Sequence, residues 1–218
     1  MKRTFLYTFL ISGSLHAYEP KAHEQWWHAN CTEKIPLYRQ WYGDADIKER
    51  TFICKYLKDK QYQSILDVGC SLCSLFFAIK KEKVAIDYTG LEVTKAFVDR
   101  AAKFGIPVIY GSVEELPCQD NSYDCIYMRH VLEHLEYYEK AITHMIRVAK
   151  KEVIISFFKH PNNWMPDTIE LVKVDSMPLY HNQYNKLKID TFVKQNPKVA
   201  SLKWDYIGND YALCITLK

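Results

Sequence analysis

Residues 130–134 read His-Val-Leu-Glu-His, a spacing of residue types that could bind zinc. In the H-x-x-E-H signature of the inverzincin proteases, two histidines bind the metal and the glutamate acts as general base. That chemistry requires the motif to lie within a helix, whereas a strand-like run, residues 123–128, comes just before the first histidine. We therefore expect no metal here, and a zinc hydrolase that uses His130, Glu133 and His134 stays only as an alternative.

Two further residues stand where strand-like runs end. Gly69 closes the apolar run of residues 64–69, and a glycine there lets backbone approach a ligand closely because it has no Cβ. Glu92 ends the next strand-like run, where a carboxylate can accept hydrogen bonds from both ribose hydroxyls of a nucleoside. The pair predicts a nucleoside site, with a solvated strand end as the alternative for Glu92.

These residues can form one site only if the strands that precede them end at the same edge of a sheet. Strand-like and helix-like runs alternate from about residue 61 onward, which is typical of a parallel sheet with helical crossovers. The last two strand-like runs flank Gly208-Asn209-Asp210, which predicts an antiparallel hairpin. We predict an α/β fold: a doubly wound, Rossmann-like sheet of seven strands, mostly parallel, with a C-terminal antiparallel hairpin and helices on both faces. The predicted strands are residues 64–69, 88–93, 108–110, 123–128, 152–158, 202–207 and 211–217, and the predicted helices include residues 74–81, 94–104 and 136–150.

Four stretches, LDVGCSLC, GLEVT, GSVEELPCQDNSYD and YMRHVLEHL, occur in the order and spacing of a known family. The chain resembles the class I S-adenosylmethionine-dependent methyltransferases of the type 11 group over roughly residues 47–217. The resemblance implies S-adenosylmethionine as cofactor, with its methionine part on the loop after the first strand. The cofactor-binding residues that it implies are Asp67, Gly69, Cys70 and Ser71 in that loop, Glu92 and Val93 at the ribose, Ser112, Val113 and Glu114 at the adenine, and Arg129 and His130 near the sulfonium.

The sequence departs from the family pattern in the first loop. The family has D-x-G-x-G-x-G, and Ser71 and Cys73 replace its second and third glycines. If either position needs a positive φ, a non-glycine residue costs of order 1 kcal/mol or more. Ser112 also stands where the family has an acidic partner for the adenine amino group. A non-catalytic S-adenosylmethionine-binding protein on the same fold is therefore a second alternative.

The implied reaction is in-line displacement of the methyl group by a small-molecule acceptor. A protein base helps only when the acceptor is a neutral hydroxyl, and His130 is the candidate base because an imidazole titrates near neutrality. The alternative is that His130 only lines the methionine end of the cofactor. We expect Glu133 and His134 to lie behind the site or at the surface.

An insert at residues 159–184 is longer than a simple connection, and it follows the carboxyl end of a strand. Together with an aromatic, helical N-terminal cap at residues 18–60, it is predicted to enclose the acceptor, unless it is a surface excursion that only covers the sheet edge. The predicted acceptor-binding residues are Trp27, Tyr180 and His181, with Trp26 and Trp41 in the same cap.

Composition narrows the class of protein further. The net charge is only +3 and is spread along the chain, unlike the basic stripe of a dedicated nucleic-acid binder, so we expect no nucleic-acid partner. Residues 1–17 have the plan of a secretory signal but are too short to span a membrane. Residues 61–218 then form the methyltransferase-like domain. A cytosolic cofactor and seven cysteines without a framework spacing favour the cytoplasm, with export as the alternative. The oligomeric state is not indicated.

Overall fold

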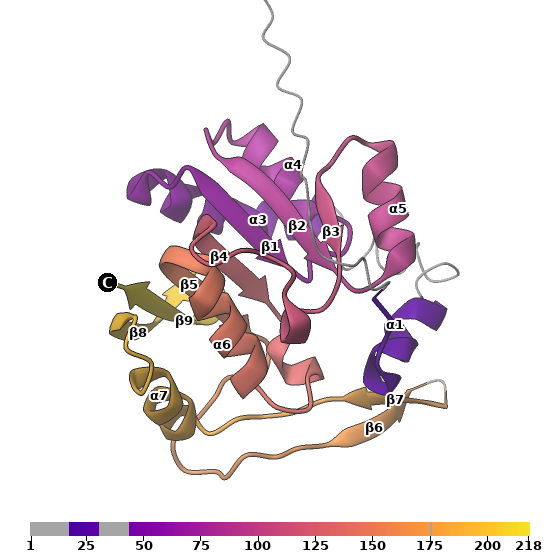
Figure 1. Ribbon diagram of the computed structural model, residues 1–218, viewed down its shortest axis with the longest axis vertical. Helices are drawn as coiled ribbons and strands as arrows, with labels where there is room; N and C mark the ends of the chain where they lie inside the picture. Colours follow the sequence, from indigo (N-terminus) through magenta and orange to yellow (C-terminus); the bar gives the residue numbers. More distant parts are fainter. Residues whose placement is uncertain (1–17, 31–43, 175) are drawn as a thin grey trace, which may run out of the picture.

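The structure is a computed structural model that describes residues 18–30, 44–174 and 176–218 (Figure 1). Its main sheet has seven strands in the order β3-β2-β1-β4-β5-β9-β8. Strands β1 to β5 pair in parallel, and β9 is antiparallel to both β5 and β8. The predicted fold class is confirmed, including the terminal hairpin. The strands are β1 (Ser64–Val68), β2 (Asp87–Glu92), β3 (Val108–Tyr110), β4 (Tyr123–Arg129), β5 (Ala149–Phe157), β8 (Val199–Ile207) and β9 (Asp210–Leu217).

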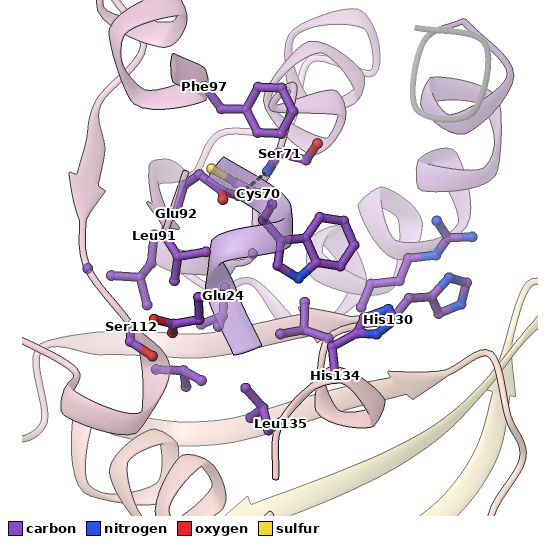
Figure 2. A pocket seen from close by; sticks show the side chains of 18 of the residues that line it. Glu24, Cys70, Ser71, Leu91, Glu92, Phe97, Ser112, His130, His134 and Leu135 are labelled. Atoms are coloured by element: carbon purple, nitrogen blue, oxygen red, sulfur yellow. Dashed lines mark hydrogen bonds between the residues drawn. The ribbon is translucent and has the colours of Figure 1, made fainter. Parts of the chain in front are cut away.

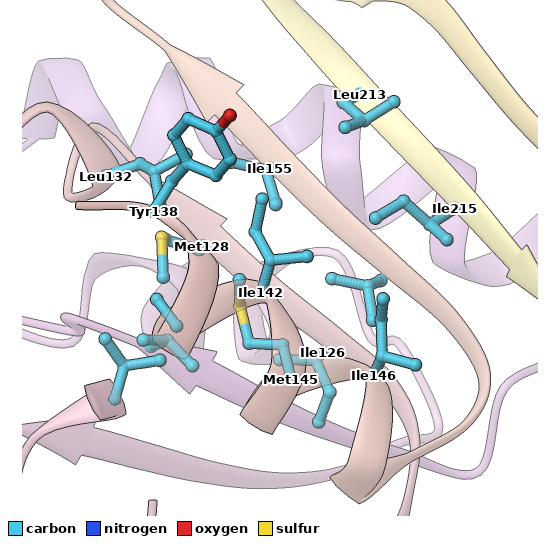
Figure 3. Packing of buried hydrophobic residues seen from close by; sticks show 14 of the residues in the cluster. Ile126, Met128, Leu132, Tyr138, Ile142, Met145, Ile146, Ile155, Leu213 and Ile215 are labelled. Atoms are coloured by element: carbon cyan, nitrogen blue, oxygen red, sulfur yellow. The ribbon is translucent and has the colours of Figure 1, made fainter. Parts of the chain in front are cut away.

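Helices cover both faces of this sheet because neighbouring strand residues point to opposite sides. In β4, Ile126 and Met128 join the cluster under α6 and α7, shown in Figure 3, while Cys125 and Tyr127 join the cluster under α3 and α4. The helices are α1 (Gln25–Asn30), α3 (Asp44–Lys60), α4 (Ser74–Lys81), α5 (Lys95–Lys103), α6 (Glu139–Val148) and α7 (Lys186–Lys194), and the 3₁₀ turns are η1 (Ala22–Glu24), η2 (Val113–Glu115) and η3 (Leu132–His134).

Helix α6 ends two residues before the predicted boundary at residue 150. Ala149 already pairs with Tyr123 as the first residue of β5. The ammonium of Lys198 donates hydrogen bonds to the carbonyls of Ile146, Arg147 and Ala149 at 2.7, 3.2 and 3.0 Å. A lysine from a distant segment therefore satisfies the open carbonyls at the helix end, which is where a cation is also favoured by the helix dipole.

The insert contains a hairpin that the sequence pattern did not predict. Strands β6 (Leu171–Val174) and β7 (Met177–Tyr180) pair only with each other, in antiparallel register. Helix α1 lies beside β7 in Figure 1, and the two are in contact. Trp26 from α1 and Leu179 from β7 share a buried cluster with Phe97 of α5. The hairpin of the insert therefore packs against α1, whereas α3, which was predicted to belong to the same N-terminal cap, packs on the sheet. Enclosure of an acceptor by the insert and the cap stays a prediction.

Some expectations fall on residues that are not described. The signal-like residues 1–17 and Trp41 lie outside the described ranges. Within those ranges, no helix is long and apolar enough to cross a membrane. The described cysteines are free thiols, among them Cys70 and Cys73, whose sulfur atoms lie 3.8 Å apart.

Candidate functional site

A pocket of about 910 Å³, part of it open to solvent, lies where β1, β2 and β4 end. Figure 2 shows Glu92 and Ser112 on one side of it and the two imidazoles of His130 and His134 on the other. This is the sheet edge at which the sequence predicted a nucleoside site. The predicted cofactor residues that line the pocket are Gly69, Cys70, Ser71, Glu92, Val93, Ser112, Val113, Arg129 and His130.

Two predicted cofactor residues do not line the pocket. Asp67 is buried, and its Oδ2 accepts a hydrogen bond from the hydroxyl of Tyr88 at 2.9 Å. Glu114 faces the N-terminal segment, where its Oε2 lies 3.2 Å from the ammonium of Lys21. In the structure, both carboxylates hold neighbouring protein groups, and contact with a cofactor stays a prediction for them.

The loop between β1 and α4 has the left-handed backbone that glycine favours. Gly69, Ser71 and Cys73 have φ angles of 70°, 48° and 58°. Ser71 and Cys73 therefore adopt the strained conformation that their replacement of glycine implied, at about 1–2 kcal/mol each. A Cβ on Gly69 would stand 2.4 Å from Cγ2 of Val131, so the close approach at this glycine is to the η3 segment as well as to the pocket.

Glu92 holds this loop in place. Its Oε2 accepts from the Ser71 N–H and its Oε1 from the Thr94 N–H, both at 2.8 Å. Burial raises the pKa of this carboxyl, although the two backbone N–H groups favour its charged form. Each carboxylate oxygen has more than one lone pair, so Glu92 can also accept hydrogen bonds from ribose hydroxyls.

His130 stands at the end of β4 in a left-handed conformation, with φ 56°. Its backbone N–H donates a hydrogen bond to the Ser156 carbonyl at 3.0 Å. Its ring Nε2 lies 3.4 Å from Oδ1 of Asp210 but is not aligned for a hydrogen bond with it. Arg129 pairs with the same carboxylate through Nε and, at 3.2 Å, through Nη2. Burial lowers the pKa of His130, so its imidazole is neutral at pH 7. The sequence pattern gave Asp210 only a turn role and missed this contact.

Of the other residues of the H-x-x-E-H motif, Glu133 lies behind the pocket wall and His134 forms part of the wall. The motif spans a strand end and the 3₁₀ turn η3 rather than a helix. Glu133 is buried, and its Oε1 accepts from the N–H groups of Phe158 and Lys159 at 2.8 and 3.2 Å. Burial raises the pKa of Glu133 to about 7. His134 lines the pocket, a position that the sequence did not predict for it.

The N-terminal segment supplies part of the pocket lining. Trp27, His23 and Glu24 line the pocket, and the sequence had not singled out His23 or Glu24. Contact of Trp27 with an acceptor stays a prediction. Lys21 ties the segment to η2 through ion pairs with Glu114 and, at 3.3 Å, with Glu115. One indication of this contact was present in the sequence, a stretch rich in tryptophan and histidine ahead of the first strand. Other lining residues that sequence reasoning missed are Arg50, Val68, Ser74, Leu91, Phe97, Gly111, Val131 and Leu135.

A metal-like spacing occurs in this segment rather than in the motif. Ligand atoms of His23, Glu24 and Glu114 lie within 4.8 Å of one another. The Lys21 ammonium already sits beside Glu114 and neutralises part of this negative charge. We therefore assign the cluster to the closure of the segment. The expectation of no bound metal stays a prediction.

Tyr180 and His181 lie one layer behind the pocket. The ring of His181 stacks on Phe158 at 5.2 Å and on His134 at 6.1 Å between centroids. The ring of Tyr180 lies 5.4 Å from that of His23. The two residues support lining residues in the structure, so direct contact with an acceptor stays a prediction for them.

Residues 66–157 match the family model for a methyltransferase domain. Over this range the chain is similar to methyltransferase domains. This range runs from β1 to β5 and carries Gly69, Glu92, Ser112 and His130, so most of the residues that line the pocket lie within the matched range.

Solved structures share the fold over most of the chain. One is magnesium protoporphyrin IX methyltransferase from Synechocystis with bound SAH, with a TM-score of 0.63 and 16% identity, covering 89% of this chain and 100% of that one. Another is 1,6-didemethyltoxoflavin-N1-methyltransferase from Burkholderia thailandensis, bound to 1,6-didemethyltoxoflavin and S-adenosylhomocysteine, with a TM-score of 0.59 and 12% identity, covering 92% of each chain. At these identities the likeness concerns the fold of the methyltransferase domain.

Proposed function

We propose that the chain binds S-adenosylmethionine in this pocket and transfers its methyl group to a small-molecule acceptor. The observation that carries the proposal is the placement of Gly69, Glu92 and Ser112 around one pocket at the strand ends of a methyltransferase domain. The two similar structures hold S-adenosylhomocysteine, the product that such a reaction leaves, which supports the same cofactor here.

The residues around the pocket fit this cofactor. Glu92 offers a buried carboxylate to the ribose hydroxyls, and the Oγ of Ser71 is buried without a hydrogen-bond partner beside it. Leu91, Val113 and Leu135 supply an apolar slot for adenine. Gly69 gives backbone access for the methionine part, as the family pattern implies.

The cofactor supplies an electrophilic methyl group when bound, so the chain mainly has to orient an acceptor and exclude water. Trp27 covers the pocket from the N-terminal segment and limits solvent entry. His130 is neutral at pH 7 and stands at the strand end, where it can accept a proton from a hydroxyl acceptor. Arg129 is charge-paired with Asp210 and holds the strand end in place.

Calorimetry with S-adenosylhomocysteine tests the cofactor site. Glu92→Ala removes the acceptor for ribose and the brace of the Ser71 loop, so affinity should fall by about 1–3 kcal/mol, or roughly 5- to 150-fold. Asp99→Asn is the matched control, because this carboxylate is exposed on α5 and pairs only with Lys95. Equal affinity of wild type and Glu92→Ala would remove Glu92 from the site.

The strained residues Ser71 and Cys73 favour one second candidate, a protein that binds the cofactor without transferring methyl. Incubation with labelled S-adenosylmethionine and fractionated lysate separates the two. Cofactor binding without any labelled product would support the binding protein. The zinc hydrolase finds no support in the geometry, because Glu133 holds the Phe158 and Lys159 N–H groups behind the pocket.

A further inference from the structure

One hydrogen bond fixes the tautomer of His134. Its Nδ1 lies 2.8 Å from the carbonyl oxygen of Tyr180. A carbonyl can only accept, so the proton of the neutral ring is on Nδ1 and Nε2 carries a lone pair. In the part of the chain that the structure describes, no protein group forms a hydrogen bond with Nε2. Because His134 lines the pocket, this lone pair is available to a ligand.

Rings from several elements hold the imidazole in one orientation. His134 stacks on Phe158 with centroids 5.3 Å apart and planes 29° apart, and His181 continues the stack. Trp27 meets His134 edge to face at 5.1 Å. Glu133 in turn fixes the backbone of Phe158. An imidazole that is bound at Nδ1 and packed by rings presents Nε2 in a set direction.

The groups around His134 also keep it uncharged. Burial lowers its pKa to about 4. His181, His130 and Lys159 face it and disfavour a second proton, while the Tyr180 carbonyl favours one. His134 is therefore a hydrogen-bond acceptor over the neutral pH range, and it is a much weaker base than a free imidazole.

We propose that His134 determines acceptor specificity: its Nε2 accepts a hydrogen bond from an O–H or N–H group on a planar ring that packs against Trp27. The proposal rests on the methyl-transfer function proposed above and names the substrate class. A ring that covers Nε2 shields it from water, so an analogue without a donor hydrogen would leave this acceptor atom unpaired and bind less tightly. The aromatic walls suit a flat ring.

Phenol and anisole are the probes, because both are flat and only phenol has a donor hydrogen. With S-adenosylhomocysteine bound, calorimetry should show phenol binding at least about fivefold more tightly than anisole to the wild type. His134→Phe keeps a stacked ring without an acceptor nitrogen and should bring this ratio close to one. His160→Phe is the matched control, because His160 packs on Tyr211 away from the pocket, and it should keep the wild-type ratio.

Two readouts separate this inference from the proposed function. The affinity of His134→Phe for S-adenosylhomocysteine should stay within about twofold of the wild-type affinity. If the wild type does not bind S-adenosylhomocysteine, the proposed function itself is overturned. Nitrogen NMR should place the proton of His134 on Nδ1 at pH 7. If the cofactor product binds normally, equal affinity for the two probes, failure of both to bind, or a proton on Nε2 would overturn the inference.

Discussion

Glu133 is a carboxyl group with no exposed surface, and its protonation is coupled to folding. Its pKa is about 7 in the folded chain because of burial, against an ordinary value of 4.5. Between these values the folded chain keeps a proton that the unfolded chain has lost. The stabilising contribution of the protonated group is therefore present below pH 4.5 and is lost as the pH rises through 7.

Replacing this carboxyl with an amide should remove the loss of folding stability that occurs as the pH rises. Glu133→Gln keeps an oxygen for the Phe158 and Lys159 N–H groups and cannot ionise. We expect the variant to be more stable than wild type at pH 8 by about 1–3 kcal/mol, with the difference vanishing below pH 5. Urea unfolding across this pH range measures it, with exposed Glu170→Gln as control. A variant that is less stable at pH 8 would contradict the expected cost of ionisation.

Single residues could be predicted from sequence where backbone chemistry is local. The D-x-G loop and the glutamate after the second strand fixed Gly69 and Glu92 by position alone, and the replaced glycines at Ser71 and Cys73 predicted their strain. His134 could not be placed, because its role depends on the carbonyl of Tyr180, far along the chain. Glu24 escaped prediction for the same reason, since it meets the pocket only through tertiary packing.

At the scale of elements, the apolar pattern of the sequence predicts helix and strand bounds correctly where neighbouring residues are strongly buried. Helix α4 and strand β3 have their predicted bounds, because apolar residues recur along α4 and Gly105 and Gly111 lie on either side of β3. The end of α6 is set by Lys198, a residue that lies outside any local window. The hairpin of β6 and β7 is half-exposed and does not join the main sheet, so its apolar pattern is weak and Leu179 is its one buried residue.

Docking of α1 should control how fast the pocket releases its ligand. Trp26 is 6% exposed and packs with Phe97 and Leu179, so Trp26→Ala should loosen the segment by about 3 kcal/mol or more. We expect faster dissociation of S-adenosylhomocysteine in stopped-flow measurements, because Trp27 and Glu24 would no longer cover the pocket. Trp164→Ala is the control, because Trp164 is 84% exposed. Identical dissociation rates in both variants would show that the segment does not gate the pocket.

Over the whole molecule, the site depends on segments that are distant in sequence. The start of β9 lies at the same sheet edge as the end of β4, because β9 runs antiparallel to β5, and the N-terminal segment covers the pocket at this edge. Asp210 begins β9 and pairs with Arg129 next to His130. The hairpin therefore completes the sheet and also anchors the pocket, which a reading of local runs along the chain does not reveal.

Asp210→Asn tests this double role. The change removes the charge of one member of a largely buried ion pair, and breaking such a pair costs up to about 3–5 kcal/mol, which urea unfolding would show. Asp210 also favours the protonated form of His130, so the pKa of His130, already lowered by burial, should fall further in an NMR titration. Asp205→Asn is the control, because Asp205 is exposed on β8, and its ion pair with Lys203 is also exposed. Equal stability losses in the two variants, or a higher pKa of His130 in Asp210→Asn, would show that the hairpin does not anchor the pocket.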